Sequence, residues 1–361
     1  MKNKLILLLL IIFFIISILT IYSTTNILPS YYKFIHYKQL IWYVLGFFII
    51  FILYKNKNGF FYKYDKLLYI IFNIFLLLVL IFGEITNGSK AWFNIPGIGS
   101  FQPSEFMKII LIIFLSNILN KANKHDLKSE FITIIKCLII TLIPAILTFL
   151  EPDTGNVIIY FIILFTMIFI YGISYKWYIF LLIMIIPFTF IIFNSINNQN
   201  KINSIINTEM IYRIERLFEW KNNEGMQLEN ALASIGSAPK NGYGIKNTPI
   251  YIPEAHTDFI SSILFSTFGF SISITIILLF ALFDIIIITI AYSNSKKNKY
   301  LISGIISIIL FQQVQNIGMN IGLLPITGIT LPFISYGGSS LICYMIMIGL
   351  IFNINKKKKE L

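Results

Sequence analysis

The sequence predicts an all-α integral membrane protein with about ten transmembrane helices, and three observations lead there: composition, the form of the apolar runs and the placement of charge. The chain has 361 residues, of which 57% are hydrophobic and 12% are charged. Soluble domains carry about twice that charged fraction, roughly 25%. Mean hydropathy is +0.80. The apolar runs are continuous and do not alternate with polar residues, which excludes a transmembrane barrel and requires helices.

The apolar runs divide the chain into ten expected spans. The first follows Lys2 and Lys4; it is long enough to cross a bilayer and lacks a small-x-small cleavage site, so we expect a retained helix and not a signal peptide. Residues 260–292 exceed the length of one span, so their first part is expected to form a separate short helix. The expected spans are 5–21, 39–54, 66–83, 104–120, 130–150, 156–171, 175–193, 268–292, 301–323 and 338–353.

Lysines in the short loops predict the orientation. One set of alternate loops and both ends of the chain carry most of them, and the other set carries Lys33, Lys38 and Lys90. Because cytoplasmic loops are enriched in Lys and Arg, both termini are expected in the cytoplasm. The lysines expected inside are Lys2, Lys4, Lys55, Lys57, Lys63, Lys66, Lys121, Lys124, Lys128, Lys176, Lys296, Lys297, Lys299, Lys356, Lys357, Lys358 and Lys359.

This orientation gathers the polar motifs on the extracytoplasmic face. We expect residues 1–361 to form one polytopic membrane domain, with a large extracytoplasmic loop at 195–257 between the seventh and eighth helices. The loops at 84–104, 151–155 and 325–340 are expected on the same face. The inner loops are plain Lys/Asn connectors, so the working surface is expected outside.

The net charge of +12 does not indicate a nucleic-acid partner. Its basic residues lie in short loops between apolar runs, where they set topology and contact membrane lipids. Cys137 and Cys343 both fall within apolar runs. They are expected to be small core residues, with no disulfide and no metal site between them.

The polar sequence 256–258 stands where the long loop returns to an apolar run. An ionisable group at such an edge is a functional-site hypothesis by default, which makes Asp258 the leading candidate for catalysis. The alternative is that Thr257 or Asp258 merely caps the following short helix. His256 has no second histidine nearby, and a lone histidine more often has a structural role than a metal-binding one.

Two further motifs flank the fourth span. Glu105 and Lys108 are three residues apart on one helix face, so they are expected to pair as the helix enters lipid. Lys90 and Trp92 lie in the preceding loop, where Trp92 is either a substrate contact or a member of the aromatic belt. Asp153, in the tight turn 151–155, is expected to cap the next helix, which does not exclude a second role in the site.

Two remaining segments are less specific. Arg213 and Arg216 lie one helical turn apart and suit phosphate oxygens, but a solvated basic face or contact with anionic lipid explains them equally well. The segment 322–340 contains two prolines and several glycines, which predicts a re-entrant or bent loop. Irregular backbone at membrane depth needs a cover of protein or a wet cavity, so this segment is expected to line a cavity.

Together these motifs resemble the SEDS family of bacterial cell-wall proteins, which includes RodA, FtsW and SpoVE, with RodA as the nearest member. The last motif is the most specific because of its length. The motifs that carry the resemblance are Ser89-Lys90-Ala91-Trp92, Gln102-Pro103-Ser104-Glu105, Pro152-Asp153-x-Gly155, Ile235-Gly236-Ser237, His256-Thr257-Asp258-Phe259, Gly322-Leu323-Leu324-Pro325-x-Thr327-Gly328 and Ser335-Tyr336-Gly337-Gly338-Ser339-Ser340.

The resemblance implies a ten-helix peptidoglycan glycosyltransferase of the cytoplasmic membrane. Such an enzyme polymerises lipid II with a class B penicillin-binding protein as partner, in elongation and cell shape or in division. It implies Asp258 as the essential aspartate. The residues expected to bind substrate are Lys90, Trp92, Glu105, Lys108, Asp153, Arg213, Arg216, His256, Thr257, Ser335 and Tyr336.

The chain departs from the family pattern at several places. Ser266 and Thr267 stand where many members have an acidic pair, Asn230 where the family has Gln, and Ala91 where many have Arg. The segment 238–241 replaces a Gly-rich turn. The aspartate itself is kept.

In the expected mechanism Asp258 removes a proton from an acceptor sugar hydroxyl while undecaprenyl pyrophosphate leaves the donor. Lys90, Arg213, Arg216 or a divalent cation, Mg²⁺ or Mn²⁺, would stabilise the pyrophosphate charge, although the sequence names no ligands for a metal. Two functions from other classes compete with this one. They are a lipid II flippase or transporter, and a non-catalytic membrane scaffold for a penicillin-binding protein.

Overall fold

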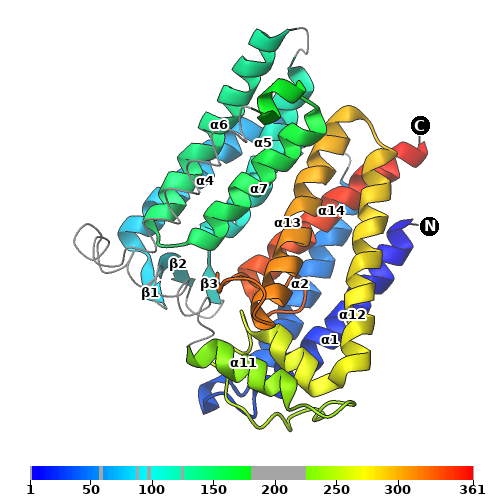
Figure 1. The fold of residues 1–361 in the computed structure, drawn as a ribbon. Helices are drawn as coiled ribbons and strands as arrows, with labels where there is room; N and C mark the ends of the chain where they lie inside the picture. The colour runs from blue at the N-terminus through cyan, green and yellow to red at the C-terminus, as the bar shows by residue number, and fades with distance from the viewer. Residues whose placement is uncertain are drawn as a thin grey trace.

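The structure is a computed structural model that describes residues 2–56, 60–86, 89–95, 99–122, 126–179 and 225–360. Long helices dominate it, and the chain ends lie at one end of the bundle while a small sheet and α11 lie at the other (Figure 1). The elements are α1 (Lys2–Thr24), η1 (Ser30–Tyr32), α2 (Ile35–Lys55), α3 (Phe60–Lys63), α4 (Asp65–Phe82), β1 (Glu84–Thr86), β2 (Ser89–Ile95), β3 (Gly99–Phe101), α5 (Pro103–Lys121), α6 (Leu127–Leu150), α7 (Thr154–Tyr171), α11 (Met226–Gly236), α12 (Ile260–Tyr292), α13 (Lys296–Asn320) and α14 (Gly338–Glu360).

The all-α membrane fold is confirmed. Within the described ranges, nine helices are long and apolar enough to cross a bilayer, and they correspond to nine of the ten expected spans. The seventh expected span, 175–193, is described only to residue 179. The most buried spans are α5 and α13, in which 78% of an 18-residue apolar stretch is buried, followed by α14 with 72%, whereas α4 has only 11% buried. Helices α5, α13 and α14 therefore form the centre of the bundle, and the helices around them have apolar faces that can contact lipid.

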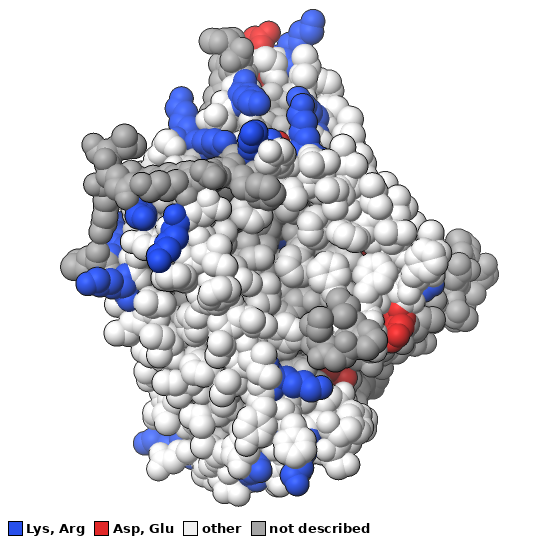
Figure 2. All heavy atoms as spheres, turned by 180° about the vertical axis from the view of Figure 1, so that it is seen from behind, with Lys and Arg blue, Asp and Glu red and all other residues white. Residues whose placement is uncertain are grey.

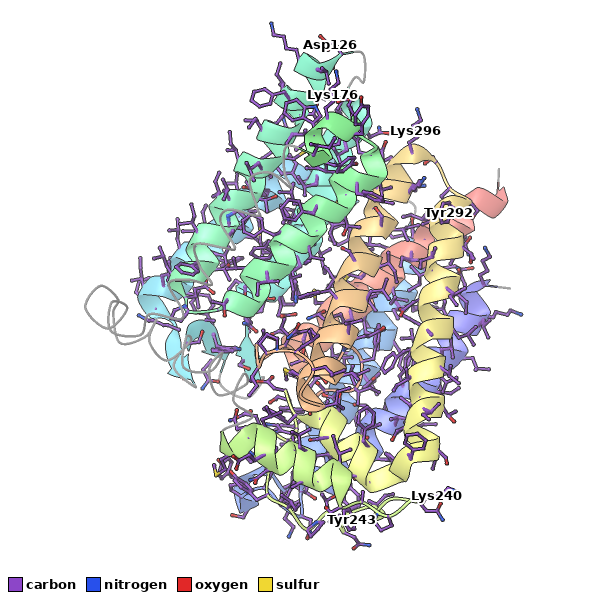
Figure 3. The ribbon with its side chains drawn as sticks, in the orientation of Figure 1. Asp126, Lys176, Lys240, Tyr243, Tyr292 and Lys296 are labelled. Atoms are coloured by element: carbon purple, nitrogen blue, oxygen red, sulfur yellow. The ribbon has the colours of Figure 1, made fainter. Side chains whose placement is uncertain are left out.

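The two ends of the bundle carry different loops. Lys176 and Lys296 lie at the end that carries both termini, and Lys240 and Tyr243 lie at the opposite end (Figure 3). Seen from behind, most basic side chains gather over the upper half of the molecule, and a smaller number lie at its lower end (Figure 2). The motifs expected to share one face thus come from one end of the molecule.

The segment 84–101 was expected to be a loop, and this expectation was wrong in detail. It forms a three-stranded antiparallel sheet in the order β1-β2-β3, with Glu84 opposite Trp92 and Phe93 opposite Phe101. The strands are short, and the ladder satisfies backbone groups at the edge of the membrane domain. The expected long loop likewise contains a helix, α11.

Helix α12 is broken as its length predicts. Gly269 lies inside it with φ 75° and ψ 178°, so residues 260–268 form a short helix that meets the span at an angle. The carbonyls freed by the break accept bonds from the loop at 240–244: Tyr243 N donates to Ser266 O at 2.8 Å and Gly244 N to Thr267 O at 3.0 Å. Thr267 also bonds Ser23 of α1 through its hydroxyl, at 3.0 Å. The two segments in which the chain departs from the family pattern, 266–267 and 238–241, therefore lie close together at this break in α12.

Candidate functional site

Asp258 lies in the last turn before α12, and Glu254 closes that turn. The Glu254 carbonyl accepts the amides of Thr257 and Phe259, each at 3.1 Å, and the Glu254 carboxylate accepts the Thr257 hydroxyl at 2.8 Å. Phe259 is the N-cap residue of α12. The alternative in which Thr257 or Asp258 is the N-cap residue of this helix is therefore wrong, and the Asp258 side chain is half-buried.

The main chain of 256–258 is held from two directions. Two amides of α13, from Asn316 and Asn320, donate to the Asp258 carbonyl at 2.8 and 3.0 Å. The hydroxyl of Ser335 donates to the Thr257 carbonyl at 2.7 Å, and the amide of Tyr336 donates to the carbonyl of His256 at 2.8 Å. These bonds fix the backbone that presents the Asp258 carboxylate.

The segment 321–337 joins α13 to α14 as a bent loop, as expected. Its irregular backbone is satisfied by side chains of the first two helices. Ser17 donates to the Ile334 carbonyl at 2.8 Å, Gln39 donates to the Ser335 carbonyl at 3.1 Å and Tyr43 donates to the Phe333 carbonyl. Protein thus provides the cover that such backbone requires at membrane depth. Ser335 and Tyr336 belong to this scaffold through the bonds described above.

Asp153 forms a second acidic turn, and the predicted cap is confirmed. Its Oδ1 accepts the amide of Asn156 at 3.1 Å at the start of α7. Its Oδ2 accepts Gln102 Nε2 at 2.9 Å, Asn156 Nδ2 at 2.7 Å and Ser104 Oγ at 3.3 Å. Four donors from α7 and the start of α5 therefore converge on one carboxylate.

The two acidic turns touch the same segment, 327–329. A Cβ added to Gly155 would lie 3.3 Å from the Thr327 carbonyl and 3.2 Å from Ile329 Cγ1. A Cβ added to Gly328 would lie 3.4 Å from Asp258 Oδ2. Gly328 is exposed and has φ 69°, a backbone conformation that favours glycine. The sequence could not show that these three motifs meet.

Glu105 and Lys108 form the predicted ion pair on α5. Lys108 Nζ lies 2.8 Å from Glu105 Oε1, and the Lys108 side chain is fully buried. The Glu105 carbonyl also accepts the Cys343 thiol of α14 at 3.0 Å. This burial favours a role in holding α5 against α14 over direct contact with a phosphate.

Strand β2, which contains the predicted substrate-binding residues Lys90 and Trp92, is hydrogen-bonded to the turn 151–155. Ser89 Oγ and Lys90 N donate to the Glu151 carbonyl at 2.6 and 3.2 Å. The Lys90 ammonium donates to the Ile81 carbonyl, at 2.9 Å, near the end of α4. In this conformation Lys90 satisfies a helix terminus, and Trp92 is half-buried in the sheet.

Glu151 is a residue that sequence reasoning missed. It is fully buried, and neither carboxylate oxygen has a hydrogen-bond partner among the described residues. Burial first, and then the neighbouring Asp153, raise the pKa of Glu151 to about 9. Its carboxyl group is therefore neutral at pH 7. The available signal was its position beside Pro152, directly after an apolar run.

His256 is packed between two aromatic rings. Its ring centroid is 4.5 Å from that of Tyr32 and 5.7 Å from that of Tyr336, and burial lowers the pKa of His256. Among the described residues, no group of three or more His, Cys, Asp or Glu side chains is arranged to hold a metal ion. Arg213 and Arg216 lie outside the described residues.

Comparison with known proteins gives the same family along the whole chain. The family model described as "Cell cycle protein", covering FtsW, RodA and SpoVE, matches residues 2–360. The protein named probable peptidoglycan glycosyltransferase FtsW from Wigglesworthia glossinidia brevipalpis is 36% identical over 333 residues, 87% of this chain and 82% of its own. Stage V sporulation protein E of Bacillus subtilis is 30% identical, with 94% and 93% covered.

Solved structures agree on the fold. A chain from a peptidoglycan synthase complex matches with a TM-score of 0.80 and 23% identity, covering 98% of this chain and 97% of its own. Rod shape determining protein RodA of Thermus thermophilus matches with a TM-score of 0.69 and 22% identity, covering 98% and 96%. The described bundle, its acidic turns and the whole-length family match agree, and the chain belongs to the SEDS family of FtsW, RodA and SpoVE cell cycle proteins.

Proposed function

We propose that this chain is a peptidoglycan glycosyltransferase that polymerises lipid II at the outer face of the bacterial cytoplasmic membrane. Relatives that carry the name peptidoglycan glycosyltransferase support the enzyme class. The observation that carries the chemical assignment is the Asp258 turn. Its backbone is fixed by α13 and the segment 321–337, while its carboxylate lies beside exposed Gly328. A fixed, accessible carboxylate is what a general base requires.

In the proposed reaction the hydroxyl of an acceptor sugar attacks the anomeric carbon of a donor. The new glycosidic bond forms as the bond to undecaprenyl pyrophosphate breaks, and the hydroxyl proton passes to Asp258. The pyrophosphate leaves with its negative charge, which basic groups or a divalent cation would stabilise. Arg213 and Arg216 remain the candidates for this role.

The orientation follows from the two ends of the bundle. We place the end with both termini, Lys176 and Lys296 in the cytoplasm, because short loops on that side carry the excess of lysine. The opposite end, with the sheet and the Asp258 turn, then faces outward, where lipid II is polymerised. A class B penicillin-binding protein is the proposed partner, supported by the likeness to a chain of a peptidoglycan synthase complex.

Polymerisation in detergent separates this enzyme from its two rivals. The purified chain, with its partner and labelled lipid II, is expected to form glycan strands, although no membrane is present across which a flippase can move lipid. Asp258→Asn is expected to abolish most of this activity while keeping the complex. Asp284→Asn serves as the control, because Asp284 lies on α12, the helix that follows the Asp258 turn, and accepts a hydrogen bond from Gln313. An intact complex that forms no polymer would favour a flippase or a scaffold.

A further inference from the structure

Asn316 is a fully buried amide in the middle of the site. It lies on α13 with no exposed surface, and every polar atom of its side chain has a partner. Its Nδ2 donates to the Asp258 carbonyl at 2.8 Å and to the Ile329 carbonyl at 2.7 Å, and its Oδ1 accepts the hydroxyl of Ser261. One side chain therefore joins the Asp258 turn, the segment 327–329 and the first turn of α12.

The planar amide fixes the relative position of what it joins. Its two N–H bonds diverge at a set angle, so the carbonyls of Asp258 and Ile329 cannot shift independently without breaking a bond. Ile329 directly follows Gly328, where an added Cβ would lie 3.4 Å from Asp258 Oδ2. The distance between that carboxylate and the segment that borders it is thus set by Asn316. A base must lie within hydrogen-bond reach of its proton, and small displacements lower the rate strongly.

We infer that Asn316 is a positioning residue for the glycosyl transfer, which holds the Asp258 carboxylate at a set distance from the segment 327–329. This inference rests on the proposed function of Asp258 as the base. Asn316 acts through the main chain of Asp258 and does not touch the substrate. Its loss therefore lowers kcat and leaves the KM for lipid II and the affinity for it nearly unchanged.

Two other amides on α13, Asn320 and Gln315, allow the positioning role of Asn316 to be distinguished from a contribution to helix packing. Asn320 also donates to the Asp258 carbonyl, at 3.0 Å, but its second bond, at 2.8 Å, goes to its own helix, at the Asn316 carbonyl. It therefore does not tie Asp258 to the segment 327–329. Gln315 is buried and its side-chain amide donates to the same loop, at the Pro325 carbonyl, at 2.8 Å. Gln315 is the matched control.

The experiment compares Asn316→Leu with Gln315→Met in the purified complex. Both changes replace a buried amide by an apolar side chain of similar shape and remove a bond between α13 and the loop. Asn316→Leu is expected to lower kcat about 10- to 100-fold with KM changed less than about threefold. Gln315→Met is expected to change kcat less than about threefold. The midpoint of thermal unfolding and the yield of complex are measured for each variant.

Asn316→Ala removes the donor and the acceptor without adding bulk, so it replaces the leucine variant if that variant does not fold. A folded Asn316 variant with kcat near that of the wild type would overturn the inference. So would a loss that appears in KM alone, or an equal loss of kcat in Gln315→Met. Asp258→Asn is measured in parallel. If it retains wild-type kcat, the base assignment fails, whereas an inactive Asp258→Asn beside a fully active Asn316→Leu overturns only the positioning role.

Discussion

The Asp258 and Asp153 turns lie against the same short segment, 327–329, yet the two aspartates are held in different ways. Asp153 is held through its carboxylate, which accepts four hydrogen bonds from the starts of α5 and α7. Asp258 is held through its main-chain carbonyl, which accepts the amides of Asn316 and Asn320. An aspartate that is fixed through its backbone can exchange the partners of its carboxylate during a reaction without losing its position.

The comparison predicts that the Asp153 carboxylate contributes mainly to stability. Asp153→Ala removes the cap of α7 and leaves the donors of Gln102 and Asn156 without their acceptor, at a cost of about 2–4 kcal/mol in the free energy of unfolding. The expected readout is a clear fall in the midpoint of thermal unfolding in detergent. Asp153→Asn, which keeps an oxygen for the cap, is expected to lose less. An unchanged midpoint in Asp153→Ala would show that the network contributes little.

Glu151, beside Asp153, predicts a pH dependence with a definite sign. Because burial raises its pKa from 4.5 to about 9, the folded chain binds one more proton than the unfolded chain between these values. This contribution to stability is complete below about pH 4.5 and is lost as the pH rises toward 9, with a slope of at most about 1.4 kcal/mol per pH unit.

Glu151→Gln removes the titrating group, so its unfolding midpoint should fall less between pH 6 and pH 8 than that of the wild type. Glu84→Gln, which changes a carboxylate in β1 with an exposed partner in Asn94, is the control and should keep the wild-type slope. Parallel slopes for the wild type and Glu151→Gln would contradict a neutral buried carboxyl at this position.

Substitution of Gly328 tests whether the space beside the Asp258 carboxylate is used in the reaction, and its expected effect is smaller. Alanine there is strained at φ 69°, which costs about 1 kcal/mol, and its methyl group would lie 3.4 Å from Asp258 Oδ2. We expect a roughly tenfold lower polymerisation rate with a small loss of stability. Gly236→Ala is the control, because nothing lies within 4 Å of a Cβ at that position. Equal rates for the two variants would show that the space beside Asp258 is not used.

Most of the helices could be predicted from the sequence, because a membrane-spanning helix requires a long continuous run of apolar residues. Local chemistry was also readable: the Glu105–Lys108 pair, the Asp153 cap and the break before 269 each depend on neighbours within a few residues. The sheet was missed because its strands are short and lack a clear alternation. The scaffold of Asp258 was missed because its donors are distant in sequence, as with Gln39 and the Ser335 carbonyl.

The missed donors share one property that a sequence does reveal. Asn316, Asn320 and Gln39 are uncharged amides inside apolar runs, where a polar group must find a partner. A search limited to ionisable groups finds Asp284 and passes over them. Which partner each amide finds depends on contacts between helices, and one sequence does not specify those.

The most direct measurement sets the two aspartates against each other with the same substitution. Polymerisation rate, lipid II affinity and unfolding midpoint are measured for Asp258→Asn and Asp153→Asn in the purified complex. Asp258→Asn is expected to lower the rate about 10²- to 10⁴-fold with affinity and midpoint unchanged, and Asp153→Asn to lower the midpoint with most of the rate retained. A near wild-type rate in folded Asp258→Asn would contradict the assignment of Asp258 as the general base.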